Sequence, residues 1–134
     1  MNLKSSSLFY LVPGVILILG FSSFNQTTPW TVPDAAAKAA NPVKADAASL
    51  ETGKSLWATH CQSCHGKKGM GDGNKAAQLK TAPGDFTKPE FQKQSDGTLF
   101  HKTSEGKGDM PSFKKKITDP EEIWSLVNYM RKFK

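Results

Sequence analysis

The sequence predicts an all-α fold, with about three to four helices joined by long loops, and two segments of the chain carry this prediction. From Leu50 to Cys61, apolar or small residues recur at spacings of three and four, which places them along one side of a helix. Residues 119–122 form a typical helix start, with Asp119 as N-cap and proline at the first helical position. No segment shows the alternation that is typical of a strand.

The first helix of the predicted domain begins near Ser49, a suitable N-cap with Glu51 in the first turn. Gly53 falls inside this helix, where glycine costs about 1 kcal/mol relative to alanine. A backbone or an aromatic ring packed closely against the helix would explain this glycine.

The middle of the chain predicts loops and one further helix. Residues 66–94 are rich in Gly, Lys and Pro and show no sustained periodicity. A short helix fits residues 95–104, with Ser95 or Asp96 as its cap and Gly106 just after its end.

The last helix has a wide apolar face. At about 100° per residue, its apolar side chains cover more than half of the helix circumference. One neighbouring helix would not need so wide a face, whereas a helix wedged between another helix and a large flat cofactor would. These side chains are Ile123, Trp124, Leu126, Val127, Tyr129, Met130 and Phe133.

Residues 1–23 have the layout of an export signal. Lys4 precedes an apolar run from Leu8 to Phe21, and small residues follow it. The segment is therefore a cleaved signal peptide or, because the run approaches the length of a spanning helix, an uncleaved membrane anchor. Both outcomes place the remaining chain outside the cytoplasmic membrane, in the periplasm or exported.

The chain after this signal divides into a tether and a domain. Residues 24–48 are rich in Ala, Pro and Thr with few large apolar side chains, which predicts a flexible tether. Trp30 is the exception, and we expect it to dock on the domain. Residues 49–134 form the domain itself, whose small size suits a core completed by a cofactor.

The charge of the chain favours an acidic protein partner over nucleic acid. Its 18 Lys and Arg residues outnumber 12 Asp and Glu residues, giving a net charge of +6. Such a surface steers encounters with acidic surfaces. Arg131 is the only arginine, so the bidentate guanidinium contacts typical of nucleic-acid recognition are nearly absent.

Cys61, Cys64 and His65 form a Cys-x-x-Cys-His motif, the attachment pattern of a c-type haem. Thiols at i and i+3 of one helical turn face the same way and can add to the vinyl groups along one porphyrin edge. The histidine that follows then binds the iron. Zinc would need further ligands, for which only His60 and His101 remain at unsuitable spacing. A redox-active cysteine pair expects a βαβ setting, and a disulfide across so short a gap would be strained.

Met110 is the predicted second iron ligand, because methionine sulfur pairs with histidine in electron-transfer haems. It lies 45 residues beyond His65 on a loop, where Pro111 helps to fix its approach. Met70 is only five residues from His65, and Met130 falls in the last helix, where a core role is expected. His101 is the alternative ligand.

With these motifs assembled, the chain resembles a class I cytochrome c of the small bacterial mono-haem type, over about residues 49–133. The resemblance implies that the first and last helices cross closely, with Gly53 and Trp57 against Val127 and Tyr129. It also implies a loop proline, here Pro83, whose carbonyl accepts from the other nitrogen of His65. The pieces that carry it are Gly53-Lys54 and Leu56-Trp57, residues 61–66, the loop at 69–73, Met110-Pro111, and residues 124–131.

The expected function is that of a monomeric one-electron carrier with one haem c, ligated by His65 and Met110, which serves redox protein partners with acidic docking surfaces. It has no substrate of its own. Two alternatives remain: the haem subunit of a larger oxidoreductase, or a haem enzyme with an open iron site. A haem gas sensor is a further alternative, although the Met110-Pro111 pair argues against it, because a sensor needs a vacant or displaceable ligand position.

Overall fold

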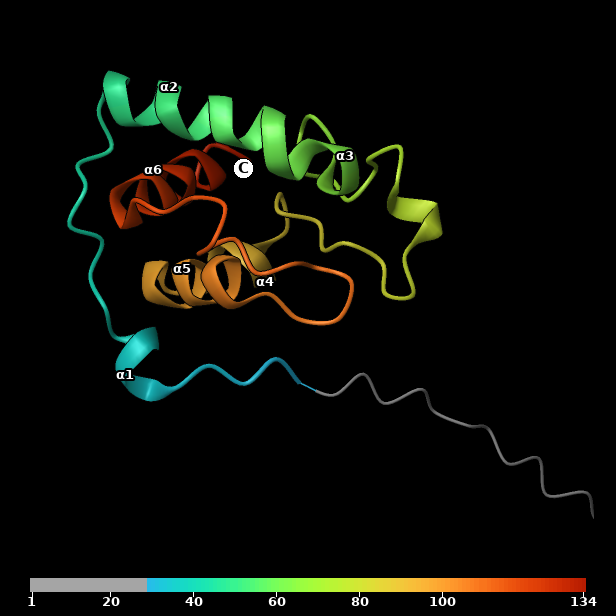
Figure 1. Ribbon diagram of the computed structural model, residues 1–134, viewed down its shortest axis with the longest axis horizontal. Coiled ribbons are helices and arrows are strands. Elements are labelled where there is room, and N and C mark those ends of the chain that lie inside the picture. Colours follow the sequence, from blue (N-terminus) through green and yellow to red (C-terminus); the bar gives the residue numbers. More distant parts are fainter. Residues whose placement is uncertain (1–28) are drawn as a thin grey trace, which may run out of the picture.

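The computed structural model describes residues 29–134, which form helices and loops with no β-strand in that range (Figure 1). The all-α prediction is confirmed. The export signal predicted for residues 1–23 lies outside the described residues. Between residues 29 and 134, no helix is both long enough and apolar enough to cross a membrane.

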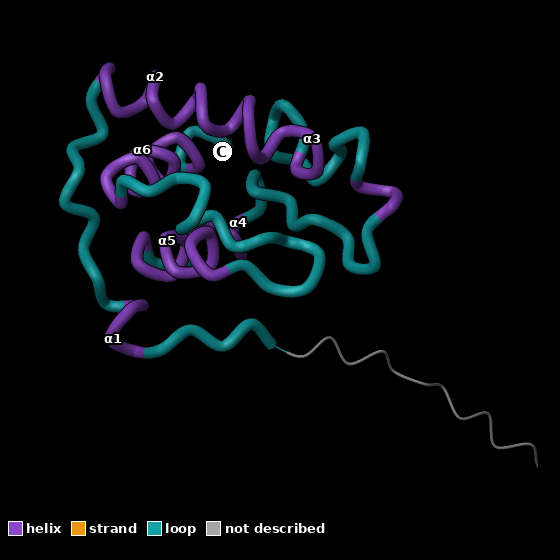
Figure 2. Tube along the Cα trace, viewed as in Figure 1, coloured by secondary structure: helices purple, strands orange, loops and turns teal. Residues whose placement is uncertain are grey.

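Three consecutive elements form one continuous helical run: α2 (Ala47–Leu56), the π-helical η1 (Trp57–Cys61) and α3 (Gln62–His65) (Figure 2). The run starts earlier than predicted, because Asp46 and not Ser49 is the N-cap. The Asp46 carboxylate accepts from the backbone N–H of Ser49, while the buried Ser49 hydroxyl donates to the Lys44 carbonyl.

The π-helical turn of η1 lies directly before the cysteine motif. The backbone N–H of Gln62 donates to the Trp57 carbonyl, five residues back. The turn between Trp57 and Cys61 therefore contains one residue more than a regular α-helical turn. Such turns are frequent at functional sites.

The two later helices match their predictions closely. In α5 (Asp96–Glu105), the Ser95 hydroxyl accepts from the N–H of Thr98, and Gly106 ends the helix with a φ of 69°. In α6 (Pro120–Met130), Asp119 accepts from the N–H of Glu121. Three single-turn helices complete the described chain: α1 (Asp34–Ala37), η2 (Ala76–Gln78) and α4 (Pro89–Gln92).

The α2 helix crosses α6 in close contact at Gly53. A Cβ atom at this position would clash with the backbone carbonyl of Ser125 and with Cβ of Tyr129. One turn later, the rings of Trp57 and Tyr129 lie 6.3 Å apart. Val127 lies instead on the side of α6 that faces α5, in a cluster with Leu99 and Trp124.

The α6 helix separates two hydrophobic clusters, which accounts for its wide apolar face. Leu126 and Val127 are fully buried, although they belong to different clusters. Figure 1 shows α6 lying between α2 and α5. The larger cluster joins α6 to η1 and to the later loops through Trp57, Cys61, Phe86, Phe113, Ile117 and Phe133.

Arg131 fastens the end of α6 to the start of α5. Its Nε and Nη2 atoms donate to Oδ1 of Asp96, at 2.9 and 2.6 Å. Its Nη1 and Nη2 atoms also donate to the carbonyls of Gln92 and Gln94. The single arginine of the sequence thus serves the fold, because its planar fork reaches several acceptors at once.

Residues 29–43, called the strap below, run along the domain where the sequence predicts a flexible tether (Figure 1). The Asn41 side chain donates to the side chain of Asn128 and to the Trp124 carbonyl. Ser95 donates to the carbonyl of Ala37. These contacts are polar or backbone-mediated, so a composition poor in large apolar residues does not reveal them.

We expect Gly53→Ala to lower the free energy of unfolding by about 2–3 kcal/mol, because a rigid backbone carbonyl and a helix-borne Cβ occupy the space that a methyl group would need. Chemical denaturation followed by circular dichroism measures this. Lys54→Ala is the control, since this neighbouring side chain is exposed. Equal stability of the two variants would refute the close crossing.

Candidate cofactor site

A cavity of about 560 Å³ holds the predicted site residues Cys61, Cys64, His65 and Met110 along its walls. Its volume lies within the range of cofactor pockets in proteins, about 300–1,000 Å³. Residues 45 positions apart in the chain thus meet at one site, as the ligand prediction requires. Trp57 and Pro83 also line the cavity, whereas Tyr129 stays at the helix crossing.

Cys61 and Cys64 are free thiols one helical turn apart. Burial raises the pKa of the Cys61 thiol to about 12, and the neighbouring Cys64 adds to this shift. The group is therefore a thiol and not a thiolate at neutral pH. Within residues 29–134, no group of three or more His, Cys, Asp or Glu side chains is arranged to hold a metal ion.

His65 enters the cavity from the end of α3 and is surrounded by aromatic rings. Its ring centroid lies 4.7 Å from that of Phe86 and 5.8 Å from that of Trp57. Burial lowers the pKa of His65, and an interaction with the Gly84 backbone opposes this shift. The Nδ1 atom of His65 is buried and has no hydrogen-bond partner among the described residues.

The loop predicted to orient His65 lines the cavity, but no hydrogen bond joins it to the buried Nδ1 of His65. Pro83 lines the cavity, but its carbonyl oxygen faces Gly71, where a Cβ atom would lie 2.5 Å from it. Gly71 has a φ of 76°, which a residue with a side chain rarely adopts. The backbone of Gly84, one residue further on, is near enough to raise the pKa of His65 against the effect of burial.

Trp57 fixes the turn that follows His65. Its indole Nε1 donates to the carbonyl of Gly66 at 3.1 Å, and both groups are buried. Since Trp57 also contacts His65, one side chain holds both the imidazole and the backbone that leaves it. Phe86 and Phe91, which stack at 3.8 Å, extend this aromatic wall.

The loop that carries Met110 is anchored at both ends of its turn. The backbones of Lys107 and Met110 exchange two hydrogen bonds, at 2.9 and 3.1 Å. Gly106 and Gly108 have positive φ values of 69° and 58°, which permit this tight reversal. Further along, the Ser112 hydroxyl donates to the carbonyl of Ser104 in α5 at 2.7 Å.

The other candidate ligands are placed differently. Met70 is 51% exposed and does not line the cavity. Met130 does reach the cavity from α6, but it is 3% exposed and belongs to the larger hydrophobic cluster. His101 is half-buried in α5 and is not among the lining residues, whereas His60 is.

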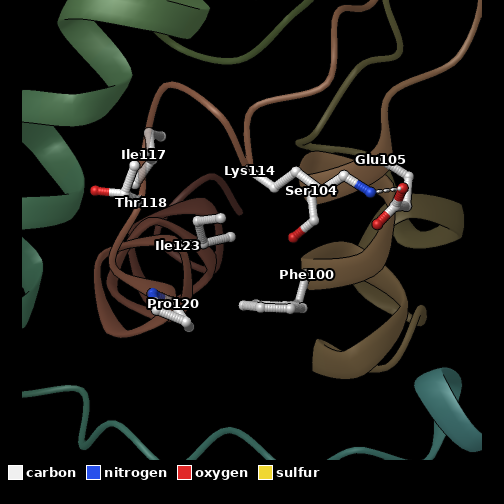
Figure 3. Close-up of a pocket in the computed structure, with 8 residues that line it drawn as sticks. All are labelled: Phe100, Ser104, Glu105, Lys114, Ile117, Thr118, Pro120 and Ile123. Carbon is white, nitrogen blue, oxygen red and sulfur yellow. Dashed lines mark hydrogen bonds and ion pairs between the residues drawn. The ribbon is translucent and has the colours of Figure 1, made fainter.

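A second cavity, of about 230 Å³, lies between α5 and α6 and contains none of the predicted ligands (Figure 3). Glu105 and Lys114 form an ion pair of 2.6 Å at one side of it, and Phe100 and Ile123 face each other across it. The Ser104 hydroxyl is buried beside it without a hydrogen-bond partner. This cavity adjoins the anchor of the Met110 loop, because the Ser104 carbonyl holds Ser112.

The donor set of the larger cavity fits a covalently attached haem. It combines thiols one helical turn apart, an imidazole directly after them, a thioether from a separate loop, and apolar and aromatic walls. No local pattern in the sequence places Phe86, Phe91 or Lys102 at this site. Trp30 also lines the cavity, in line with the expectation that it docks on the domain.

Comparisons with known proteins agree with a c-type cytochrome fold. The family model described as cytochrome c oxidase, cbb3-type, subunit III matches residues 48–130. A similarity search of curated proteins returned no match.

Solved structures of c-type cytochromes share the fold. The KustC0563 c-type cytochrome is 36% identical, with a TM-score of 0.54, over 61% of this chain and 96% of its own. A point mutant of that cytochrome, with one tyrosine replaced by phenylalanine, gives 35% identity and a TM-score of 0.53, over 62% of this chain and 99% of its own. The reducing HAO-like protein complex Kustc0457/Kustc0458 of Kuenenia stuttgartiensis matches at 28% identity and a TM-score of 0.62. That match covers 69% of this chain but 46% of the other, so this chain spans about half of its relative.

We expect Trp57→Phe to lower the free energy of unfolding by about 1–3 kcal/mol, because the buried Gly66 carbonyl loses its donor. The freed turn should also broaden the resonances of the His65 ring in NMR spectra. Trp124→Phe removes a similar ring from the other cluster and serves as the control for ring size. Unchanged His65 resonances in Trp57→Phe would contradict the role assigned to the indole.

Proposed function

Because this chain belongs to the c-type cytochrome family described as cytochrome c oxidase, cbb3-type, subunit III, we propose that it is a one-electron carrier with one haem c. In this proposal Cys61 and Cys64 bind the haem through thioether bonds, and His65 and Met110 bind its iron. The single observation that carries it is that all four side chains line one cavity of about 560 Å³. Bound there, haem supplies an iron that changes its charge by one electron.

The protein side chains hold the site and exclude water from it. Trp57, Phe86 and Phe113 are at most 6% exposed and form apolar walls. A site with fixed ligands and little water reorganises little when its charge changes, which favours electron transfer. With His65 and Met110 both engaged, no position remains for oxygen or another small ligand, which separates a carrier from an oxidase site or a gas sensor.

The partners in this proposal are redox proteins with acidic surfaces. Exposed lysines follow the loops that line the cavity, after the cysteine motif and on both sides of Met110. Like charges distributed this way steer an acidic partner toward the haem edge more than they add affinity. These lysines are Lys67, Lys68, Lys75, Lys80, Lys107, Lys114, Lys115 and Lys116.

A second candidate is a haem c subunit of a larger oxidoreductase. It is favoured by the likeness to a chain of the reducing HAO-like protein complex, which is about twice as long as the matched region. The same cavity would then pass electrons within the complex. Size-exclusion chromatography of the protein purified from its native membranes and soluble fraction separates the two: a monomer supports the free carrier.

Export of the chain, with the N-terminal segment cleaved or kept as an anchor, belongs to the same proposal, because c-type haems are attached outside the cytoplasm. Residues 1–23 carry the signal-like pattern that supports it. N-terminal sequencing of the mature protein distinguishes cleavage from retention, and a cytoplasmic location of the haem-bearing protein would contradict both.

In the mature protein we expect Met110→Leu to abolish the Met-sulfur charge-transfer absorption of the oxidised form and to permit carbon monoxide binding by the reduced form. Leucine keeps the apolar volume and removes the sulfur ligand. Mass spectrometry first establishes that the polypeptide carries one haem. Met70→Leu, at an exposed position, is the control. If Met130→Leu lost the band and Met110→Leu kept it, the iron ligand would be Met130 of α6 and not Met110.

We expect the rate of electron transfer to an acidic partner to fall as salt rises, because screening at about 0.15 M ionic strength reduces steering beyond roughly 8 Å. Lys67→Gln with Lys68→Gln should flatten this dependence, since both cations lie directly beside the cysteine motif. Stopped-flow kinetics at increasing salt measures both effects. Lys44→Gln, in the segment before α2, should leave the slope unchanged; a flat profile in the unmodified protein would rule out acidic docking.

A further inference from the structure

The cavity has a charged end that neither the thioether bonds nor the iron ligands explain. Lys102 and Lys107 both line it, one from α5 and one from the loop after it. Besides these lysines, the predicted ligands and His60, Asp109 is the one other titratable group on the described walls. Its carboxylate already accepts from the backbone N–H groups of Lys80 and Thr81.

Lys102 is held in place by uncharged groups. Its Nζ donates to the amide oxygen of Gln94 at 2.6 Å and lies 5.4 Å from the centre of the Trp30 ring. Burial lowers the pKa of Lys102, and the charge of Lys107 lowers it further. A half-buried ammonium beside a second cation is costly unless an anion joins it.

The strap brings Trp30 to this charged end. The Lys107 ammonium donates to the carbonyl of Pro29 at 3.1 Å, so the residue before Trp30 is tied to the same cation. Further along, Gly97 of α5 packs directly against the backbone of Ala36 and Ala39, where a Cβ atom would not fit. The aromatic ring thus reaches the cavity on a segment that is fastened at several points.

The charged end lies across the fold from the cysteines. Figure 1 shows the α2–α3 run along the upper edge of the molecule and the start of the strap, as far as α1, along the lower edge; the chain after α1 climbs the side toward α2. Haem carries its vinyl groups and its carboxylates on different edges of the macrocycle. If Cys61 and Cys64 held the vinyl edge, Lys102 and Lys107 would be the lysines on the described walls of the cavity that could receive the carboxylates.

We propose that Trp30, Lys102 and Lys107 form the site that receives the carboxylates of the bound haem, with the strap closing the cavity over them. This rests on the proposed function, since it requires a haem attached at the cysteine motif. The two lysines supply the countercharge, and the Trp30 ring shields the ion pairs from water. The strap precedes the region matched by the family model, so this part of the site belongs to the chain's own N-terminal segment.

The test is the pH profile of the reduction potential in haem-bearing variants. An adjacent cation lowers the pKa of a carboxyl group by roughly 1–3 units. In Lys102→Gln and in Lys107→Gln, the inflection due to the haem carboxylates should therefore move up by about one pH unit or more. Lys93→Gln makes the same charge change at an exposed position outside the cavity and should leave the profile unchanged.

Two control experiments exclude other causes of a shift in this inflection. His60 also titrates on the cavity wall, so the shift must persist when His60→Gln is combined with each lysine variant. Inorganic phosphate, added at constant ionic strength, should not alter the profile of the unmodified protein. If phosphate does alter it, the lysines bind a free anion and the assignment to the haem carboxylates is overturned.

Trp30 is tested separately as a shielding group. Trp30→Ala should lower the reduction potential, because water reaching the cavity stabilises the more highly charged oxidised iron. Trp30→Phe should restore most of the loss. If both lysine variants keep the normal profile while haem is attached and its spectrum is intact, this site is wrong and the electron-carrier function stands. If no haem is attached to the unmodified protein, the proposed function itself fails.

Discussion

The direct contact between α2 and α6 determines where everything else in the molecule lies. Because Gly53 has no side chain, the α2 backbone rests on the Ser125 carbonyl and on Tyr129. The helical run that leaves this contact carries the haem-attachment motif, residues 61–65, into the side of the fold that α6 leaves open. A wider spacing between the helices would move the whole motif outward and enlarge the cavity beyond what the later loops can close.

The loops on the other side of the cavity are held by a small number of hydrogen bonds in addition to the buried side chains of Phe86, Phe113 and Ile117. Gln92 donates through one amide nitrogen to the carbonyls of Phe86, Met130 and Phe133. The Met110 turn depends on its glycines and on its hydrogen bonds to neighbouring backbone. A cofactor bound in the cavity would add to this interior, as expected for a domain of this size.

Helix ends can be predicted from the sequence where local chemistry decides them. Ser95, Gly106 and Asp119 mark helix ends through their own side chains or backbone freedom, and the structure places the ends there. The predicted start of α2 was wrong, because both Asp46 and Ser49 are good N-caps and only the burial of the Ser49 hydroxyl separates them. The motif residues were also found in advance, since their spacing follows from the geometry of one helical turn. Long-range polar contacts cannot be predicted in this way. No local pattern indicates that the strap pairs with α6, that Lys102 of α5 lies over the ring of Trp30, or that Lys107 binds the Pro29 carbonyl.

The π-turn at η1 has a consequence for how the helix is phased. An α-helix advances about 100° per residue, so one extra residue in a turn rotates all that follows relative to what precedes it. The side of α2 that packs on α6 and the side of α3 that bears the thiols therefore need not lie on one continuous α-helical stripe. The upstream half therefore packs on its neighbour, while the downstream half presents the thiols to the hollow that they line.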